Sequence, residues 1–418
     1  MKRTIIFATV LSAALASSGS GAYVTNLTVR QDWPWSGKVN IDFTLVADAS
    51  ADIDMTATYD GGSIDLAKGG LTGTRYSVAP GDCHYEWNAA AAGFSSALAN
   101  FRLNVSAVDA SDRTYLVFDL SDGSHAFLAD VPSGGWTDEY KTSKLVFRRI
   151  PSGTFTMGAS DELRTFAGFT DTREKAHAVT ISSDYYMAIF PLTKAQYNYI
   201  DFGSAGGGDT SAAWYSYDSL RGTVSSDSIN WPRTGHRVAA GKFIDKCRAR
   251  FGGAFLFDLP TEAMWERAAK AGGTGLFYPV VDGTLNFPNG GTKDELVEFK
   301  GSNTTGLLDA IALWRMSGSD TSQTVGQKLP NPWGLYDTCG LVEEWCIDDG
   351  TSVTGPLSDE TDPPGSSNDA PAQRIRRGIC FDANGTPSQD TTVVRRVAWS
   401  ANSARGVRLC IYLVPFVE

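Results

Sequence analysis

The sequence has few of the features that support zinc sites or membrane spans. It contains no Cys-x-x-Cys motif, so a structural zinc site has little support. Only four histidines occur in the 418 residues, and they show no metal-ligand spacing: His84, His125, His177 and His236. No stretch beyond the N-terminus reaches about 18 consecutive apolar side chains, the length that suggests a membrane-spanning helix. We therefore expect no zinc centre and no transmembrane segment.

Basic side chains are also fewer than acidic ones. The chain has 36 Lys and Arg against 47 Asp and Glu, a formal net charge of -11. Such a field repels phosphate backbones, so nucleic acid is not an expected partner. The hydrophobic fraction of 42% is sufficient for a substantial core, and the length suggests more than one domain.

The N-terminus has the pattern of an export signal. Lys2 and Arg3 precede an apolar run from Ile5 to Leu15, which is too short to span a bilayer and is followed by small residues. We interpret residues 1–22 as a cleaved signal peptide. The protein is accordingly predicted to be extracellular, periplasmic or associated with the cell envelope.

Residues 23–130 predict an all-β unit. Val39, Ile41, Phe43 and Leu45 alternate with polar residues, as one buried strand face requires. The segments 102–109 and 114–120 repeat this pattern. Short strands separated by turn residues indicate an antiparallel β-sandwich of immunoglobulin-like type. A Ser/Gly/Asp-rich segment, residues 131–144, is predicted to be a linker.

Residues 145–418 predict a second, mixed domain with few regular elements. Segments 242–250 and 262–271 are helical in composition, and Thr261 can cap the second helix. Most of the remainder consists of glycine, aromatic and turn residues without a strong period. The chain as a whole has 43 Gly, 21 Phe, 15 Tyr and 11 Trp. Long loops on a small scaffold would explain this composition.

This second part contains an ordered set of short motifs. They are Ile-Pro-Ser-Gly-Thr-Phe-Thr-Met-Gly at 150–158, Leu-Pro-Thr-Glu-Ala-Met-Trp-Glu-Arg-Ala at 259–268, Val-Gly-Gln at 325–327, Asn-Pro-Trp-Gly-Leu-Tyr-Asp at 331–337, Gly-Leu-Val-Glu-Glu-Trp-Cys at 340–346, Arg-Arg-Gly at 376–378 and Gly-Val-Arg-Leu at 406–409. In this order and spacing they resemble the formylglycine-generating enzyme, or sulfatase-modifying factor, family. The resemblance covers about Leu145 to Tyr412 and implies an α+β domain with a C-type-lectin-like fold.

The resemblance implies copper chemistry, but the expected ligands are incomplete. Family oxidases bind copper(I) through two nearby cysteines that follow an Arg-Gly-Gly-Ser-Trp phrase, and soft thiolates are the ligands copper(I) selects. The phrase here is Arg-Gly-Ile-Cys-Phe at 377–381, and the cysteine after Cys380 is Cys410. We therefore predict loss of the oxidase activity and no copper. Cys380 stays the one catalytic candidate, and pairing with Cys339 or Cys346 in a rearranged, active copper site is the alternative.

The resemblance further implies a calcium loop and disulfides. In the family's calcium motif, Glu344 keeps the acidic ligand whereas Leu341 replaces an asparagine, so Glu344 is predicted to be a structural calcium ligand. Comparable family positions are bridged, which suggests a Cys247–Cys410 disulfide. Cys339 and Cys346 flank the calcium-like loop and are predicted as a second pair.

These observations favour an exported binding module without oxidase activity. Trp214, Tyr215 and Tyr217 lie among Gly and Ser residues in a segment predicted to be a loop and suit contacts to a peptide, glycan or protein. The competing interpretation is that these aromatic side chains cover the core. An active formylglycine-generating oxidase and a structural component of the cell envelope are the alternative functions.

Overall fold

The computed structural model divides into two compact units, which are described separately. The structure describes residues 21–32, 36–60, 62–95, 98–169, 172–221, 238–251, 255–281, 286–287, 289, 310–312, 324–351, 359–363, 365, 373–378 and 392–413. Within these residues, no helix has both the length and the apolar character needed to cross a membrane.

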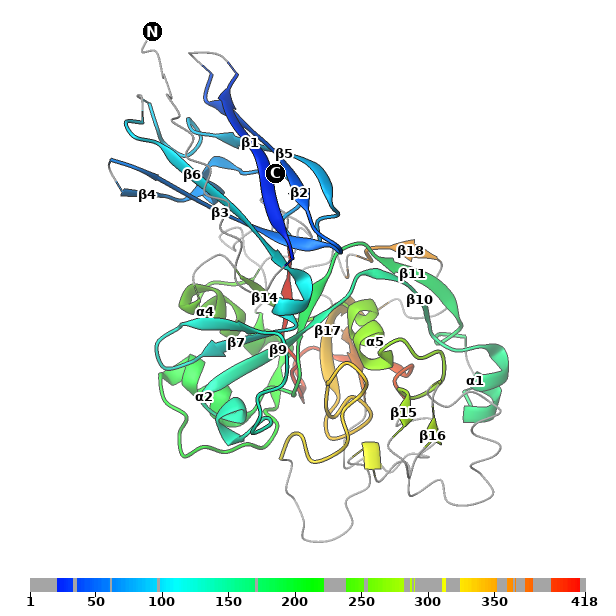
Figure 1. Ribbon diagram of the computed structural model, residues 1–418. Coiled ribbons are helices and arrows are strands. Elements are labelled where there is room, and N and C mark those ends of the chain that lie inside the picture. Colours follow the sequence, from blue (N-terminus) through cyan, green and yellow to red (C-terminus); the bar gives the residue numbers. More distant parts are fainter. Residues whose placement is uncertain are drawn as a thin grey trace. The chain divides into compact units, whose positions relative to one another are not determined.

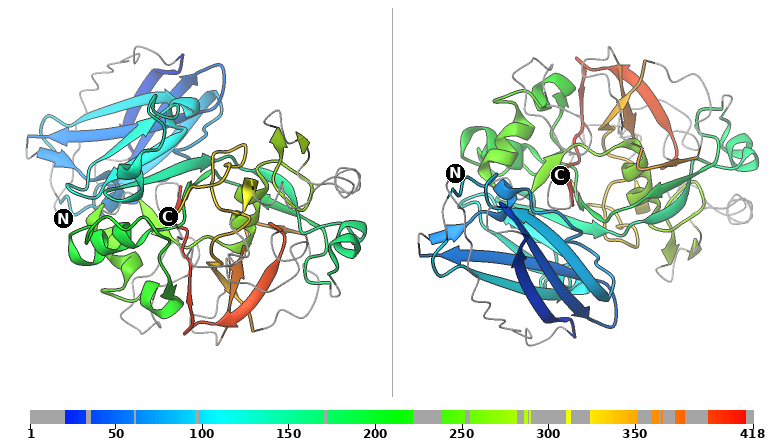
Figure 2. Two further views of the ribbon diagram at one scale, coloured as in Figure 1. Left: turned by 90° about the horizontal axis from the view of Figure 1, so that it is seen from below. Right: turned by 90° about the horizontal axis from the view of Figure 1, so that it is seen from above.

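The first unit is a β-sandwich of two three-stranded sheets (Figures 1 and 2). One sheet has the order β1-β2-β5 and the other β4-β3-β6. The strands are β1 (Tyr23–Gln31), β2 (Lys38–Val46), β3 (Ala51–Tyr59), β4 (Gly62–Ile64), β5 (Gly81–Asn88) and β6 (Arg102–Asp109). Two 3-10 turns, Leu66–Gly69 and Ala110–Arg113, complete it.

Alternation along the strands explains why the two sheets pack together. In β2 every second side chain from Val39 to Leu45 is buried, as the sequence predicted. These side chains form one hydrophobic cluster with Trp87 of β5 and with Ile53 and Val105 of the other sheet. The sandwich is confirmed, whereas its immunoglobulin-like type is not established by the strand pairing.

The compact units divide the chain one hairpin earlier than the sequence pattern indicated. Segment 114–120 forms a strand, but the alternation is not seen in its burial: Tyr115 to Phe118 of β7 (Tyr115–Asp119) are all buried, and β7 pairs with β9 (Lys144–Ile150) in the second unit. The sandwich strands therefore end with β6. The predicted linker 131–144 is likewise assigned to the second unit and includes a 3-10 turn, Asp138–Lys141. Alternation alone does not show which sheet a strand joins, so the sequence could not place this boundary.

The second unit contains several small sheets and one larger sheet (Figure 1). The larger sheet has the order β14-β22-β12-β9-β7-β8, which adds β8 (His125–Leu128), β12 (Tyr185–Ala188), β14 (Leu256–Asp258) and β22 (Cys410–Tyr412). A second sheet consists of β10 (Gly153–Met157), β11 (His177–Ile181) and β18 (Glu360–Thr361). A third consists of β17 (Glu344–Asp349), β19 (Gln373–Arg377) and β20 (Arg396–Ser400). Two-stranded pairs join β13 (Tyr215–Ser216) to β21 (Ala404–Arg405) and β15 (Val280–Val281) to β16 (Asn286–Phe287).

The described helices of this unit are short, and local sequence explains where they begin. They are α1 (Asp161–Ala167), α2 (Lys194–Phe202), α3 (Tyr217–Leu220), α4 (Phe243–Arg250) and α5 (Glu262–Lys270). Helix α5 begins as predicted, because the Thr261 hydroxyl accepts a hydrogen bond from the Met264 backbone N–H at 3.2 Å. It ends at Ala271, which adopts a left-handed conformation.

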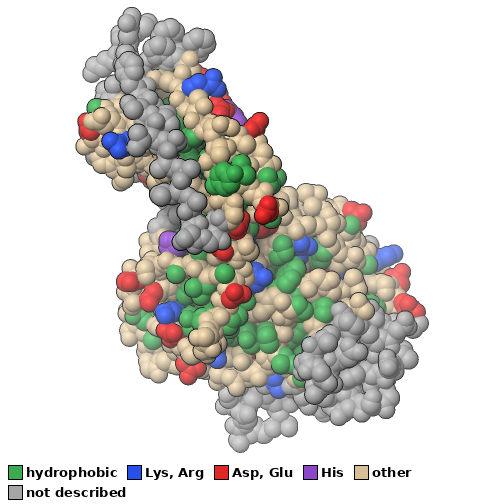
Figure 3. Space-filling model, viewed as in Figure 1, with side chains coloured by type: hydrophobic (Ala, Val, Ile, Leu, Met, Phe, Trp, Pro, Cys, Tyr) green, Lys and Arg blue, Asp and Glu red, His purple; other side chains and the backbone are tan. Residues whose placement is uncertain are grey.

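The surface of the second unit carries mixed charge. On the face displayed in Figure 3, acidic and basic side chains are interspersed with hydrophobic ones, and neither sign of charge dominates.

Phe118 provides a test of the domain boundary. Its ring lies 4.6 to 5.9 Å from the rings of Phe147, Phe251, Phe255 and Phe257, so Phe118→Ala should destabilise the second unit by about 3–5 kcal/mol. Differential scanning calorimetry should show this loss in the transition of the second unit. The matched control, Trp87→Ala, should instead lower the transition of the sandwich. A shift of the same transition by both variants would contradict the boundary.

Candidate functional site

The sheet β17-β19-β20 presents two chemically different faces. Its register places Arg377 opposite Arg396 and Arg374 opposite Trp399. Because side chains alternate along a strand, Arg377 and Arg396 project from one face, whereas Arg376 and Trp399 project from the other. The first face meets helix α5, and the second carries an exposed tryptophan.

A buried ionic cluster joins the first face to α5. Arg396 binds both carboxylate oxygens of Glu262, with an Nε–Oε2 distance of 2.8 Å. Arg377 contacts Glu266 and also lies 3.4 Å from Glu262. Lys270 Nζ completes the cluster at 2.9 Å from Glu266 Oε1. Paired charges of this kind fix how the helix docks on the sheet, because an unpaired buried charge is costly.

The cluster also sets the protonation of its members. Burial acts to raise the pKa of Glu266, but the neighbouring Lys270 and Arg377 hold that pKa below its usual value. The carboxylate is therefore ionised at neutral pH. It accepts a further hydrogen bond, 2.6 Å long, from the Gly158 backbone N–H. The motifs at 150–158, 259–268 and 376–378 thus meet in one structural network.

Glu344, the predicted calcium ligand, is instead part of an ion pair. Arg408 Nη2 lies 2.8 Å from Glu344 Oε1, and Arg408 Nε lies 2.9 Å from Oε2. The Trp265 indole N–H donates to the same Oε2 at 2.5 Å. Both carboxylate oxygens are thus engaged by donors within the protein. No group of three or more His, Cys, Asp or Glu with a metal-binding arrangement occurs among the described residues. Glu344 does not fit a calcium ligand here.

The second face carries an aromatic–arginine cluster, defined as Trp399, Arg376, Arg405 and Glu343. The guanidinium carbons of Arg376 and Arg405 lie 4.5 and 5.2 Å from the centre of the Trp399 ring. Both arginines contact the Glu343 carboxylate, with Arg405 Nε at 2.9 Å. The Trp399 indole N–H donates to the Ser403 hydroxyl at 3.0 Å, and 43% of Trp399 is exposed.

Strand β13 contains one of the predicted aromatic residues, Tyr215, and lies beside β21. Strand β13 pairs with β21, which places Tyr215 opposite Arg405. Tyr215 is half-buried and stacks on Tyr197 at 3.6 Å between ring centres. Trp214, the residue before it, is also half-buried. Both side chains remain partly open to solvent.

Tyr217 has a different role. It is only 4% exposed and packs edge-on against Trp345 at 6.1 Å. The Arg374 guanidinium lies over its ring at 4.4 Å, and the Arg221 Nη1 donates to its hydroxyl at 2.8 Å. For this residue the core-packing interpretation applies, because these contacts bury the ring beneath the strands.

A glycine in the last motif allows these strands to approach. Gly406 forms a bridge with Glu344, and a Cβ at this position would lie 2.4 Å from the Val342 side chain. Any side chain would therefore push β21 away from β17. The Gly-Val-Arg motif is thereby explained by packing: Gly406 permits the approach and Arg408 binds Glu344.

The described cysteines do not form the predicted disulfides. Cys83, Cys247, Cys339, Cys346 and Cys410 are all free thiols. Cys247 lies on α4, and Cys410 lies on β22 in a hydrophobic cluster with Ile150 and Met187. Cys339 and Cys346 are both buried in the cluster around Trp265, yet they are not bonded. Cys380 lies outside the described residues.

Burial also makes these thiols poor metal ligands. It raises the pKa of Cys247, Cys339, Cys346 and Cys410 above the ordinary thiol value. Thiolate is the form that binds metals and reacts with oxidants. These four groups are therefore protected both by their low accessibility and by their raised pKa, which keeps them as thiols. Apolar contact is the role that the structure assigns to them.

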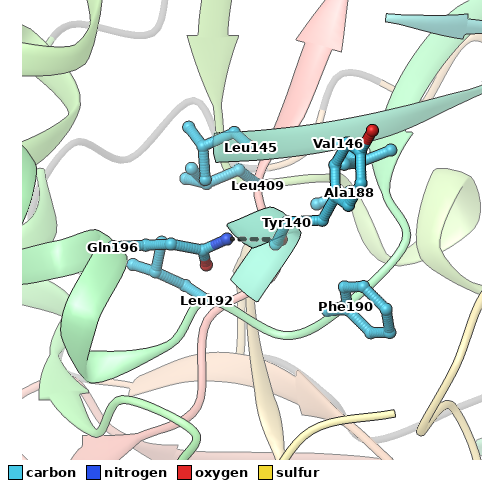
Figure 4. A pocket seen from close by; sticks show the side chains of 8 residues that line it. All are labelled: Tyr140, Leu145, Val146, Ala188, Phe190, Leu192, Gln196 and Leu409. Carbon is cyan, nitrogen blue, oxygen red and sulfur yellow. Dashed lines mark hydrogen bonds between the residues drawn. The ribbon is translucent and has the colours of Figure 1, made fainter. Parts of the chain in front are cut away.

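One small pocket lies beside the 3-10 turn at Asp138–Lys141 (Figure 4). The volume that water can occupy in this pocket is about 10 Å³, which is enough for one water molecule. The amide of Gln196 is already bonded to the carbonyls of Tyr140 and Lys144, at 3.1 and 2.7 Å. The other lining residues are Leu145, Val146, Ala188, Phe190, Leu192 and Leu409. This space is too small for an organic ligand, so the exposed cluster around Trp399 is the better candidate site.

Sequence reasoning did not identify Trp399 and Arg405 as site residues. Trp399 belongs to none of the recognised motifs, and Arg405 precedes the Gly-Val-Arg motif by one position. The polar neighbour Ser400 does not show whether the Trp399 side chain is exposed. The contacts between Trp399, Arg376 and Arg405 depend on β19, β20 and β21, which only the folded chain brings together.

Free, buried thiols can be tested by alkylation. Without reductant, iodoacetamide should leave Cys247, Cys339, Cys346 and Cys410 unmodified in the native protein, because each is buried. The same four residues should react fully in guanidinium chloride, again without reductant. Peptide mass spectrometry measures both states. A linked Cys247–Cys410 or Cys339–Cys346 peptide would contradict the free-thiol arrangement.

Asp348 predicts a characteristic pH dependence of stability. It accepts the Glu262 backbone N–H at 2.7 Å, and burial together with the Glu262 carboxylate raises the pKa of Asp348 to about 7. Between about pH 4 and 7 the folded state retains a proton that the unfolded state releases, so the free energy of unfolding decreases as pH rises. The change is at most about 1.4 kcal/mol per pH unit.

The variant Asp348→Asn isolates this contribution, because the amide oxygen can still accept the Glu262 N–H but cannot titrate. Urea unfolding at pH 4 to 8 should show that the variant gains stability relative to the natural protein as pH increases. A difference between the two proteins that is constant over this range would refute the titration of Asp348.

The comparisons with known proteins agree with this architecture. A family model described as sulfatase-modifying factor enzyme 1-like domain matches residues 138–411, so the match begins inside the predicted linker. Curated proteins yield no match. Two solved structures are similar: Treponema denticola variable protein 1, with 20% identity and a TM-score of 0.41 over 64% of this chain and 95% of that chain, and PvdO from Pseudomonas aeruginosa, with 17% identity and a TM-score of 0.38 over 64% and 94%. The chain belongs to the sulfatase-modifying factor enzyme 1-like family, as its ordered motifs predicted.

Proposed function

We propose that the protein is an exported binding module whose sulfatase-modifying-factor domain lacks oxidase activity. The oxidase chemistry implied by the resemblance requires two thiolates that bind copper(I) together. Between Cys346 and Cys410 the sequence contains a single cysteine, Cys380. A second sulfur would therefore have to come from elsewhere in the fold.

The state of the other thiols is the observation that carries this proposal. Cys339 and Cys346 were the alternative partners for Cys380, and both are fully buried in the hydrophobic cluster around Trp265. Burial raises the pKa of each thiol, which disfavours the thiolate that copper(I) needs. A copper site built from either residue would have to open this core.

The binding function is supported by partly exposed aromatic side chains on β13, on β20 and just before β13. Tyr215 and Trp214 are half-buried, and Trp399 is exposed beside Arg405. Aromatic and arginine side chains contribute strongly to protein interfaces because they combine large contact area with specific polar geometry. Tyr217, by contrast, is buried against Trp345 and does not belong to the proposed binding surface.

Three further features belong to the same proposal. The signal peptide at residues 1–22 would export the chain. The sandwich would be immunoglobulin-like, and the second unit would have a C-type-lectin-like fold, so that loops on stable scaffolds present the contacts. These assignments come from the sequence pattern and the family resemblance.

Oxygen-dependent conversion of a peptide containing Cys-x-Pro-x-Arg tests the missing oxidase activity. The purified full chain, supplied with copper(I), oxygen and a thiol reductant, should leave the peptide cysteine unchanged in mass spectrometry. The Cys380→Ser variant should give the same result. Formylglycine formation that disappears in Cys380→Ser would show an active oxidase and overturn the proposal.

A further inference from the structure

We propose that the aromatic–arginine cluster binds a side-chain carboxylate in an acidic segment of a partner protein. This inference rests on the proposed function as a binding module and specifies the ligand class of its site. The cluster is again Trp399, Arg376, Arg405 and Glu343. Its charges, its unused donors and its rigidity each contribute to the argument.

The cluster has a surplus of positive charge in an acidic protein. Two guanidinium groups, from Arg376 and Arg405, contact one carboxylate, from Glu343. The charges of these three groups sum to +1, whereas the whole chain carries -11. Glu343 is the more buried member of its pair, with 7% of its side chain exposed against 18% for Arg405. The anion is therefore inside and a cation faces solvent.

Arg405 retains hydrogen-bond donors for a ligand. Its Nε lies 2.9 Å from Glu343 Oε2, and its Nη1 donates to the Ala404 carbonyl at 2.6 Å. Its Nη2 has no hydrogen-bond or ion-pair partner in the described part of the chain. A planar guanidinium that stacks on an aromatic ring keeps its N–H edge available for a carboxylate.

The donor is held in place before a ligand arrives. The backbone of Arg405 is fixed opposite Tyr215 in the β13–β21 pair. Trp399 supports the guanidinium from its ring, and Ser403 anchors the indole N–H. Less side-chain freedom is therefore lost on binding, which favours affinity.

The contacts favour a carboxylate of a protein over a sugar or a phosphate. The guanidinium groups of Arg376 and Arg405 lie over the Trp399 ring, so they compete with a sugar for the surface of this ring. A phosphate group carries almost two negative charges at neutral pH, and the second would be repelled by Glu343. A single carboxylate matches the surplus of one positive charge.

The experiment compares short synthetic peptides as probes of the full chain. Gly-Glu-Gly-Glu-Gly is the test peptide, and Gly-Gln-Gly-Gln-Gly is its uncharged counterpart, both with an acetylated N-terminus and an amidated C-terminus so that the side chains supply the only carboxylates. A phosphoserine pentapeptide and an oligogalacturonate represent the other ligand classes. Isothermal titration calorimetry should show that the glutamate peptide binds at least about tenfold more tightly than the other three.

Variants connect this binding to the cluster. Arg405→Gln should weaken binding of the glutamate peptide by about tenfold, and Arg405→Lys by less, because it keeps the charge but loses the planar fork. Arg102→Gln, an exposed position in the sandwich, removes the same charge and should leave binding unchanged. Circular dichroism confirms that each variant is folded. If Arg405→Gln does not fold, Trp399→Phe serves as the second variant and should weaken binding by removing the indole support.

Three results would overturn the proposal. The first is equal affinity for the glutamate and glutamine peptides, which includes the case in which neither binds. The second is tighter binding of the phosphopeptide or of the oligogalacturonate than of the glutamate peptide. The third is unchanged affinity for the glutamate peptide in folded Arg405→Gln. The peptide titration is independent of the oxidase assay. An active oxidase would overturn the proposed function and leave carboxylate binding intact, whereas failure of the titration alone would leave the missing oxidase activity unaffected.

Discussion

The pairing of buried charges between helix α5 and the β17-β19-β20 sheet is the constraint on which the second unit depends. Glu262 and Glu266 project from the helix into a region from which water is excluded, and Arg377 and Arg396 neutralise them from the sheet. Removing one partner would leave a buried charge without compensation, which costs several kcal/mol. The helix therefore has one docking position, and the Glu344–Arg408 pair ties the final motif to the same sheet.

Because of this charge pairing, the two faces of the β17-β19-β20 sheet have different roles. The face toward α5 uses its charged residues entirely for packing, which explains why motif residues such as Glu344 and Arg377 are inaccessible to a metal or substrate. The opposite face of the sheet carries Trp399 and Arg376. Strand pairing and the contacts of the first face with α5 stabilise the sheet without these two side chains. Burial of four thiols in the hydrophobic interior follows the same logic, since they act as small apolar groups.

Several features of the fold could be predicted from the sequence, because they are local. Alternation in 38–46 determines a half-buried strand, and Thr261 before an acidic first turn determines the start of α5. The ordered motifs determine the family, because their spacing reflects one set of contacts. For Glu344, by contrast, the resemblance predicted a calcium ligand where the fold places an arginine and an indole.

The sequence by itself determined the strand pattern, the helix starts, the family and the number of cysteines near the oxidase motif. Only the tertiary structure decided that strand 115–119 joins the second unit, that Cys247 and Cys410 are not bonded to each other, and that Arg376 and Arg405 meet over Trp399. The physical reason is the sequence separation over which each kind of interaction acts. Propensities and caps act over a few residues, whereas sheet partners, ion pairs and stacked rings join residues that are distant in the chain and compete for partners only when the whole core forms.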